Sequence, residues 1–346
     1  MRTRLTALVF TLIVGAGLSG GCGRQPEASS PAKAGQPAPL AKVDFQLDWY
    51  PAPEHGGHYQ ALVKGYYREA GLDVNIVSGG PGAYGLQKVA TGQAAFAMAP
   101  GDDIIRAVDQ GIPLLIVGAQ MQRDPQAIMV HADSPVHTFK DLDGRSVMGS
   151  PGANWVTYLQ AHHGIKFNIV PLDYGLARFM ADKNFIQQCF ISNEPYHAEL
   201  NGAPTRAFLI AEGGYDPYRV FFTSQAYARN HPKEVAAFVA ASIRGWQDFL
   251  YGDATEARAA IAKENPSQSA ALMDYSIAAM KRYKLVDGNP ASGERIGLLT
   301  RARMQKQLDL LLELGLLSKP MLLNNLVSFD FLPPDLRALS EGTVQP

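Results

Sequence analysis

The sequence predicts an α/β protein with mainly parallel sheets, flanking helices and two lobes. Short apolar runs alternate with segments of helical periodicity, the pattern of strands that helices join into parallel sheets. The part of the chain after residue 42 has about 300 residues, beyond the size at which one hydrophobic core keeps growing. An apolar content of 47% is sufficient for two sizeable cores.

The first part of this segment contains four predicted strands separated by helices and glycine-rich turns. The strands are Val43–Leu47, Asp73–Val77, Ala94–Met98 and Leu114–Gln120. The intervening helices are Gly57–Glu69, a helix near Tyr84–Thr91 and a helix around Asp102–Asp109. This alternation of strand and helix predicts the first half of a parallel sheet.

The pattern then restarts and ends in a strongly helical region. The predicted strands are Ala127–His131, Ser146–Met148, Asn168–Leu172 and Gln188–Ser192, and a helix runs through Gln160. The later helices are Pro232–Tyr251, Thr255–Lys263, Ser267–Tyr283 and Gly293–Leu314, which carry apolar residues at helical spacing. No internal repeat is apparent in the sequence.

The N-terminus reads as an export signal. Arg2 and Arg4 precede the apolar run Leu5–Leu18, which is too short to span a bilayer comfortably. Ser19–Cys22 resembles a bacterial lipobox, although serine stands where leucine is usual, so an ordinary secreted protein is the alternative. We expect residues 1–21 to be a lipoprotein signal peptide and Cys22 to carry the lipid. Residues 22–42, rich in Pro, Ala, Gly, Ser and Gln, would form a flexible tether.

Charge and cysteine content exclude several classes of partner and site. A formal charge of −1 argues against nucleic acid or a membrane surface as the partner. After Cys22 only Cys189 remains, so neither a disulfide framework nor a cysteine-based metal site is expected. His55 and His58 lack further ligands nearby, and we expect no metal and no cofactor.

Four sequence blocks resemble one family of proteins. Leu47–Ala61 and Gly65–Val74 resemble the opening of the thiamine-pyrimidine-precursor branch of the nitrate/sulfonate/taurine-type solute-binding proteins of ABC transporters, a branch that is also similar to thiamine pyrimidine synthases. Phe139–Gly144 and Asn230–Val235 resemble steps that many binding proteins share. The resemblance extends from Lys42 to about Pro334.

The resemblance implies a type II periplasmic-binding fold, in which two lobes close on a ligand about a hinge. It places the crossings between lobes near His131 and Arg219–Val220. Lobe one would then comprise residues 43–130 and 222–335, lobe two residues 131–221, and residues 336–346 a tail. It further implies that the protein serves the permease and ATPase subunits of an importer. Together with the N-terminal export signal, we expect a lipid-anchored monomer on the periplasmic or extracellular face.

Loops after the predicted strands supply the candidate ligand-binding residues, because open α/β sheets bind ligands at the carboxyl ends of their strands. The candidates are Trp49, His55, Tyr59, Tyr84, Asp102, Asn154, Trp155, Glu194 and Tyr196. These loops contain no lysine or arginine, whereas a receptor for an anion must neutralise it, if only with helix N-termini. Aromatic faces and carboxylates instead suit a flat, nitrogen-rich, neutral or cationic ring. Each residue also has a structural alternative, such as core packing for Trp49 or helix capping for Asp102.

The resemblance implies a thiamine pyrimidine precursor, such as a formylaminopyrimidine or hydroxymethylpyrimidine, as the ligand. Riboflavin, taurine or another sulfonate, and nitrate remain alternatives, as does a lipoprotein with a sensing role. The related eukaryotic pyrimidine synthases need a histidine after the third strand and a cysteine-rich run. Pro100–Asp103 and Tyr215–Phe221 contain neither, and no Gly-x-Ser-x-Gly elbow is present, so we expect no catalytic residue and no enzyme.

Overall fold

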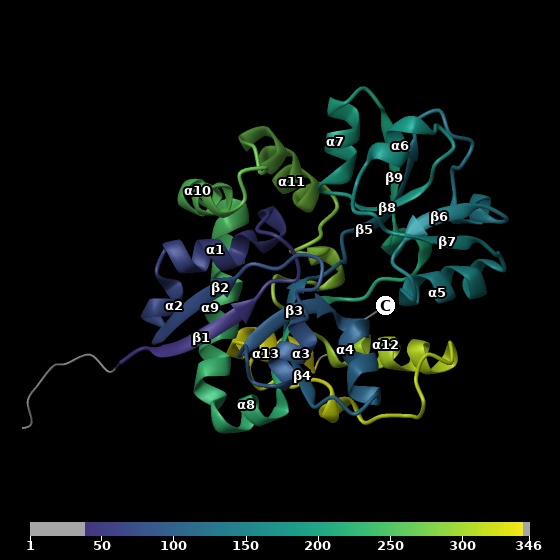
Figure 1. Cartoon of the computed structure of the whole chain (residues 1–346). Coiled ribbons are helices and arrows are strands. Elements are labelled where there is room, and N and C mark those ends of the chain that lie inside the picture. The colour runs from purple at the N-terminus through teal and green to yellow at the C-terminus, as the bar shows by residue number, and fades with distance from the viewer. Residues whose placement is uncertain (1–38, 342–346) are drawn as a thin grey trace, which may run out of the picture. The chain divides into compact units, whose positions relative to one another are not determined.

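The computed structural model describes residues 39–341, which form two five-stranded sheets (Figure 1). The first sheet has the order β2-β1-β3-β10-β4, with β1 (Ala41–Gln46), β2 (Leu72–Val77), β3 (Phe96–Pro100), β4 (Leu114–Met121) and β10 (Arg219–Ser224). The second has the order β7-β6-β8-β5-β9, with β5 (Gln126–His131), β6 (Ser146–Gly149), β7 (Asn168–Pro171), β8 (Gln187–Phe190) and β9 (Thr205–Leu209). The predicted signal peptide, most of the tether and the last five residues of the tail lie outside the described residues.

Each sheet has one strand that runs against the other four. In the first sheet β10 is antiparallel to both β3 and β4, and in the second β5 is antiparallel to both β8 and β9. The pairs β1–β2, β1–β3, β6–β7 and β6–β8 are parallel. The reversed strand is in each case the first one after the chain arrives from the other sheet. The predicted α/β fold with mainly parallel strands and flanking helices is confirmed.

The chain crosses between the sheets twice, through residues 122–125 and residues 210–218. We refer to residues 39–121 and 219–341 as lobe one and to residues 126–209 as lobe two. Residues 126–130, expected in lobe one, pair within the second sheet, and residues 219–221, expected in lobe two, pair within the first. Both faces of β5 are buried, and Ile128 and Val130 pack in the core of lobe two. A strand that is apolar on both faces does not reveal from sequence which sheet it joins.

Helices flank both sheets. Those of lobe one are α1 (Gly56–Val63), α2 (Tyr66–Glu69), α3 (Gly85–Ala90), α4 (Gly101–Asp109), α8 (Gln225–Asn230), α9 (Pro232–Tyr251), α10 (Thr255–Glu264), α11 (Ala270–Arg282), α12 (Arg301–Glu313) and α13 (Pro334–Ser340). Lobe two has α5 (Asn154–His163), α6 (Ala177–Ala181) and α7 (Glu194–Leu200). The 3-10 turns are Pro53–His55, Phe139–Leu142, Ile210–Gly213, Pro290–Ser292 and Leu323–Asn325. No helix in this part of the chain has the length and apolarity that a membrane span requires.

Three predicted boundaries were wrong for local reasons. The helix expected over Gly57–Glu69 is divided into α1 and α2, because Gly65 between them adopts a left-handed conformation (φ 76°). The last long helix begins only at Arg301, where the side chain of Thr300 caps it by accepting from the Arg303 N–H. Ala41 and Lys42, expected in the tether, pair with Leu72 and Asp73 and so start the first sheet.

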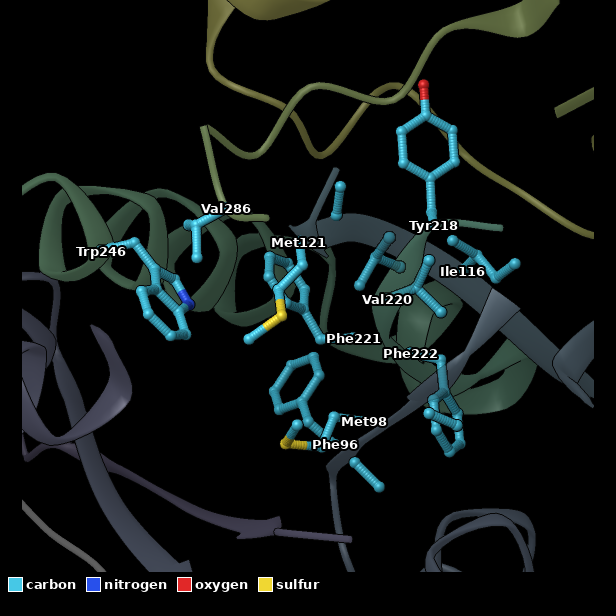
Figure 2. Close-up of a cluster of buried hydrophobic side chains, with 14 of the residues drawn as sticks. Phe96, Met98, Ile116, Met121, Tyr218, Val220, Phe221, Phe222, Trp246 and Val286 are labelled. Carbon is cyan, nitrogen blue, oxygen red and sulfur yellow. The ribbon is translucent and has the colours of Figure 1, made fainter. Parts of the chain in front are cut away.

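The largest core lies around β10, the reversed strand of the first sheet. Figure 2 shows Phe221 and Phe222 of β10 among buried side chains from β3, β4 and α9. The ring of Phe96 stacks on that of Phe238 of α9 with centroids 4.1 Å apart. Gly118 of β4 lies opposite Phe221, and a Cβ there would come within 2.1 Å of the Phe221 ring. These buried contacts hold the sheet against α9.

Close contact between α1 and α9 positions the turn that precedes α1. A Cβ at Gly245 of α9 would lie 2.1 Å from the carbonyl oxygen of Gly57, and a Cβ at Gly57 would lie 2.2 Å from the Trp246 ring. Both positions therefore require glycine. The 3-10 turn Pro53–His55 directly precedes α1, so this contact also holds Glu54 and His55 in place.

One arginine connects the two crossings. Arg303, in the first turn of α12, donates to the carbonyl oxygens of Gln122 in the first crossing and Asp216 in the second. Its guanidinium also pairs with the carboxylates of Asp216 (3.2 Å) and Glu294 (3.1 Å). Arg303, which belongs to lobe one, thus holds the two crossings next to each other.

Substitution of Gly245 tests the α1–α9 contact. We expect Gly245→Ala to lower the free energy of unfolding by about 1–3 kcal/mol, because the clash is with rigid backbone and outweighs the better helix propensity of alanine. Gln247→Ala, at an exposed position of the same helix, should change it by less than about 0.5 kcal/mol. Chemical unfolding measures both, and equal stabilities would show that the helices separate without cost.

Candidate functional site

A cavity of about 770 Å³ lies between the two lobes. That volume is in the range of small-molecule sites in proteins. Lobe one and the crossings contribute Asp48, Trp49, Tyr50, Ala52, Glu54, His55, Pro100, Asp102, Asp103, Asp124, Ile210, Ala211, Tyr215, Pro217, Arg219, Asn265, Ser267 and Gln268. Lobe two contributes Gln126, Ser150, Pro151, Gly152, Ala153, Asn154, Trp155, Leu172, Tyr174, Gln187, Gln188, Cys189, Phe190, Asn193, Glu194 and His197. The loops after β1, β3, β6 and β8 line the cavity, as predicted from open α/β sheets. The loop after β7 also lines it and was not predicted, whereas the predicted loop after β2, which contains Tyr84, does not.

Arg219 is the central charge of the cavity wall. Its guanidinium is buried, donates to Asp124 Oδ2 at 2.9 Å and forms a second ion pair with Asp48. Asp124 also accepts from the Gln126 N–H at 3.0 Å, so its two oxygens are both used. The loops predicted to bind the ligand contain no lysine or arginine, but the cavity wall gains Arg219 from the start of β10, which is not one of those loops. Both carboxylates, however, already neutralise it.

His55 is held as a neutral hydrogen-bond donor. Its Nδ1 accepts from the Ala52 N–H at 3.2 Å, so the proton lies on Nε2, which donates to Asp48 Oδ1 at 3.1 Å. Burial lowers the pKa of His55 to about 4, and the ring is therefore uncharged at neutral pH. The imidazole orients Asp48 without adding positive charge to the cavity.

A polar cluster joins the lobes at the start of α4. Asn154, the first residue of α5, donates from Nδ2 to Asp102 Oδ2 at 2.7 Å and to Asp103 Oδ1 at 3.3 Å. Tyr215 in the second crossing donates to the same Asp102 oxygen at 2.5 Å. Arg106 of α4 donates to Asn154 Oδ1 at 2.8 Å. These contacts tie α4 of lobe one to α5 of lobe two across the edge of the cavity.

Two further carboxyls line the cavity near the end of β8. Glu194, at the start of α7, accepts from the Phe190 N–H at 2.7 Å, and enclosure by protein raises its pKa to about 7. Glu54 is buried and accepts from the Ser192 hydroxyl, which connects the turn before α1 to lobe two. Burial raises the pKa of Glu54, with the Ser192 hydroxyl opposing the shift.

Aromatic rings from both lobes lie at the cavity. Trp49 follows β1, and its ring is 5.1 Å from that of Tyr174, which comes from the loop after β7 in lobe two. Tyr50 packs edge-on against Trp49 at 5.5 Å. Tyr174 has a positive φ of 60°, which is uncommon for a residue other than glycine. Trp155 of α5 is buried in the wall.

Six of the nine predicted ligand-binding residues line the cavity, namely Trp49, His55, Asp102, Asn154, Trp155 and Glu194. The other three lie outside the lining. Tyr59 is buried in α1 and donates to Glu264 at 2.8 Å, Tyr84 is 66% exposed, and Tyr196 packs on Tyr275 at 5.4 Å. Residues next to a strand end in sequence therefore do not all face the same space. Cys22, the predicted lipid site, lies outside the described residues.

Sequence analysis missed Asp124, Arg219, Tyr174 and the cavity glutamines. Asp124 lies in the first crossing, which was predicted near His131, and Arg219 directly follows the second crossing, which was predicted near Arg219–Val220. An arginine beside the apolar run Val220–Phe222 is a signal that could have been used, since a buried charge requires a partner. Tyr174 had no such signal, because its loop has no regular pattern.

Several buried polar atoms of the lining residues have no hydrogen-bond partner within residues 39–341. They are Asp102 Oδ1, Gln187 Oε1, Gln268 Oε1 and Trp155 Nε1. Three are acceptors and one is a donor, so the wall favours a ligand with several N–H or O–H groups. Across the same residues no group of three or more His, Cys, Asp or Glu side chains is arranged to hold a metal ion.

Comparison with known proteins identifies the family. The family described as "NMT1/THI5 like" matches residues 52–254, more than half of the chain. The chain belongs to this NMT1/THI5-like family. The resemblance noted from Leu47–Val74 is thereby confirmed.

Two curated relatives of this NMT1/THI5-like chain are binding proteins by name. The riboflavin-binding protein RibY of Chloroflexus aurantiacus is 27% identical over 234 residues, which are 64% of this chain and 66% of the relative. The formylaminopyrimidine-binding protein of Halalkalibacterium halodurans is 26% identical over 219 residues, 60% of this chain and 66% of the relative. The matched region is thus slightly less than two-thirds of the length of each relative.

Among solved structures, the alkanesulfonate-binding protein SsuA of Xanthomonas axonopodis pv. citri, bound to MOPS, has the same fold. It matches 84% of this chain and 99% of its own with a TM-score of 0.60 and 18% identity. At this identity the similarity shows the fold alone, which is that of the periplasmic binding proteins.

Removal of the Arg219 guanidinium tests its central role. We expect Arg219→Met to lower the free energy of unfolding by about 3–5 kcal/mol, because Asp48 and Asp124 would lose their shared cationic partner. Lys183→Met, which breaks an exposed ion pair with Asp133, should cost less than about 1 kcal/mol. Chemical unfolding of both variants measures the difference. Similar stabilities would contradict the dependence of the cavity wall on Arg219.

Proposed function

We propose that this protein is the extracytoplasmic receptor of an ABC importer and binds a small, donor-rich heteroaromatic ligand. The observation that carries the proposal is the 770 Å³ cavity, which both lobes line with aromatic rings and unpartnered acceptors. Membership of the NMT1/THI5-like family and the names of its two binding-protein relatives support it.

The ligand that we favour is a thiamine pyrimidine precursor, such as a formylaminopyrimidine or hydroxymethylpyrimidine. Trp49 and Tyr174 offer aromatic faces for a flat ring, and ring amino groups would donate to the free acceptors Gln187 Oε1 and Gln268 Oε1. Riboflavin, which one relative binds by name, also has a flat ring with N–H and O–H groups, and it is the second candidate. Sulfonates and nitrate suit the wall poorly, because its single guanidinium already pairs with two carboxylates.

Ligand binding would proceed by closure of the lobes. Asp102–Asn154, Trp49–Tyr174 and Glu54–Ser192 are contacts between elements that the hinge separates. A ligand that touches both walls adds contacts only when the lobes are together, so it shifts the population toward the closed form. The closed form would then be the one that the permease recognises, with the ATPase driving transport.

Binding without chemistry is the better interpretation than synthesis. The helix after β3 begins with Gly101, Asp102 and Asp103, where the related synthases need a histidine. Cys189 is the one cysteine in the described residues, and it is buried in β8, where burial and Glu194 raise its pKa. Although Cys189 lines the cavity, its raised pKa disfavours the thiolate that a nucleophile requires.

Export and lipid attachment at Cys22 complete the proposal. A receptor tethered by acyl chains stays near its permease on the outer face of the membrane. Cys22→Ser should release the protein from the membrane fraction, whereas Cys189→Ala, at the second cysteine, should leave it there. Fractionation followed by immunoblotting distinguishes the two. Retention of Cys22→Ser in the membrane would rule out this anchor.

A ligand panel tests the receptor and its site together. Thermal unfolding with formylaminopyrimidine, hydroxymethylpyrimidine, riboflavin, taurine and nitrate should show stabilisation by a heterocycle, about 2.7 kcal/mol at a hundredfold excess over Kd. We expect Trp49→Ala to weaken the binding of that heterocycle at least about tenfold, since a stacking face is lost.

Tyr84→Ala is the matched control, because Tyr84 is an exposed aromatic residue outside the cavity. The affinity of Tyr84→Ala for the heterocycle should equal that of the unaltered protein. Stabilisation by taurine or nitrate alone would overturn the ligand class, and stabilisation by none of the five compounds would argue against the receptor role.

A further inference from the structure

Carboxyl groups outnumber cationic groups in the wall of the cavity. Six carboxyl groups line it, from Asp48, Glu54, Asp102, Asp103, Asp124 and Glu194. Among the described lining residues Arg219 is the single arginine or lysine, and it is consumed by Asp48 and Asp124. The histidine beside them, His55, is neutral. Four carboxyl groups therefore line the cavity without a cationic partner in this part of the chain.

Two of these four carboxyls are adjacent in sequence and lie at the lobe boundary. Asp102 is buried, and its Oδ2 already accepts from Tyr215 and Asn154. Its other oxygen, Oδ1, is buried and has no partner within residues 39–341. An unpartnered carboxylate oxygen in such a place costs free energy unless a donor reaches it.

Asp103 differs from Asp102 because it is exposed and so within reach of a ligand in the cavity that it lines. Its single side-chain hydrogen bond is the 3.3 Å contact with Asn154. Desolvation of its carboxyl, together with the neighbouring carboxyls of Asp102 and Asp124, raises the pKa of Asp103 to about 8, although Arg106 opposes the shift. The groups that face the pair are thus Arg106, Asn154, Tyr215 and Asp124.

The nearby guanidinium does not neutralise the pair. Arg106, one turn along α4, directs its Nη1 to Asn154 Oδ1 at 2.8 Å and to the carbonyl of Gly152 at 3.3 Å. No ion pair joins it to Asp102 or Asp103 in the described structure. The N-terminus of α4 favours negative charge nearby, but it gives no donor to Asp102 Oδ1.

We propose that Asp102 and Asp103 form a cation subsite, which binds a positively charged amino group of the ligand. The inference rests on the proposed function and narrows its class of ligands, because it selects ligands with a charged amino group over uncharged ones. An alkylammonium has three N–H donors, enough for Asp102 Oδ1 and the Asp103 carboxylate together. On binding, the ammonium takes the place of a proton on Asp103, and this proton passes to solvent.

Three compounds with one ring test the charge preference. They carry 4-amino-2-methylpyrimidine with a 5-aminomethyl, 5-hydroxymethyl or 5-carboxylate group, which are cationic, neutral and anionic but similar in size. Titration calorimetry with the full protein should give the aminomethyl compound an affinity about 10- to 100-fold above that of the hydroxymethyl compound. The carboxylate should bind most weakly.

Asp103→Asn provides the test at residue level. It keeps the shape of the side chain and removes the charge, so the aminomethyl compound should lose about tenfold or more in affinity. The affinity for the hydroxymethyl compound should change by less than about threefold. A disturbed fold would instead weaken the binding of both compounds. Glu313→Gln, at an exposed position of α12, is the matched charge control and should change neither affinity. Thermal unfolding verifies that all variants are folded.

The dependence on pH gives a second readout. Because a proton leaves Asp103 when the cation binds, affinity for the aminomethyl compound should rise by up to about tenfold per pH unit between about pH 6 and about pH 7.5. It should level off once the pH exceeds the pKa of Asp103. In Asp103→Asn this rise should disappear, whereas a purely structural role for Asp103 would leave it unchanged.

The outcomes separate the inference from the function. If the hydroxymethyl compound binds as tightly as the aminomethyl compound, the cation subsite is overturned and the receptor stands. If Asp103→Asn weakens both compounds equally, Asp103 has a structural role and the subsite is again overturned. If none of the three binds while riboflavin does, the pyrimidine class proposed above is wrong, and the subsite inferred for it is wrong as well.

Discussion

The cavity depends on the pairing of Arg219 with Asp48 and Asp124. These three side chains come from the start of β10, the loop after β1 and the first crossing, so their contacts join segments far apart in the sequence. Charges removed from water are stable only beside a partner of opposite charge. The three side chains must therefore stay together when the chain folds. Arg303 acts in parallel from α12 and holds the two crossings together. The contacts of two guanidinium groups, those of Arg219 and Arg303, therefore fix the path of the chain between the lobes.

The same pairing determines the electrostatic character of the cavity. Since Arg219 is neutralised within the wall, the groups left for a ligand are carboxylates, amide oxygens and aromatic rings. A protein of the same fold is an alkanesulfonate-binding protein by name. If this chain binds the cation proposed above, the fold itself does not set the sign of the ligand charge. That sign depends on a few side chains at strand ends and on whether their charges are already paired.

In the proposed function, contacts between the lobes would connect ligand binding with lobe closure. Asn154 donates to Asp102 and accepts from Arg106, so one amide joins the starts of α4 and α5. These helix starts face the cavity, and a ligand that bonds to Asp102 would strengthen the attachment of one lobe to the other. Four carboxyl groups of the cavity have raised pKa values, those of Glu54, Asp103, Asp124 and Glu194, so a positive charge that enters would favour their ionised forms.

The sequence by itself determined the local elements and the segments that carry the site. The helix Pro232–Tyr251 has the predicted limits, since its apolar spacing and Pro232 at its start are local signals. Trp49 and Glu194 could be identified because ligands bind where parallel strands end. The tertiary structure decided what depends on distant partners. It assigned β5 to lobe two, it directed Tyr174 and not Tyr84 to the cavity, and it brought Arg219 to Asp48. Pairings between residues more than a hundred positions apart leave no periodic trace in the sequence, because nothing but the packed fold brings them together.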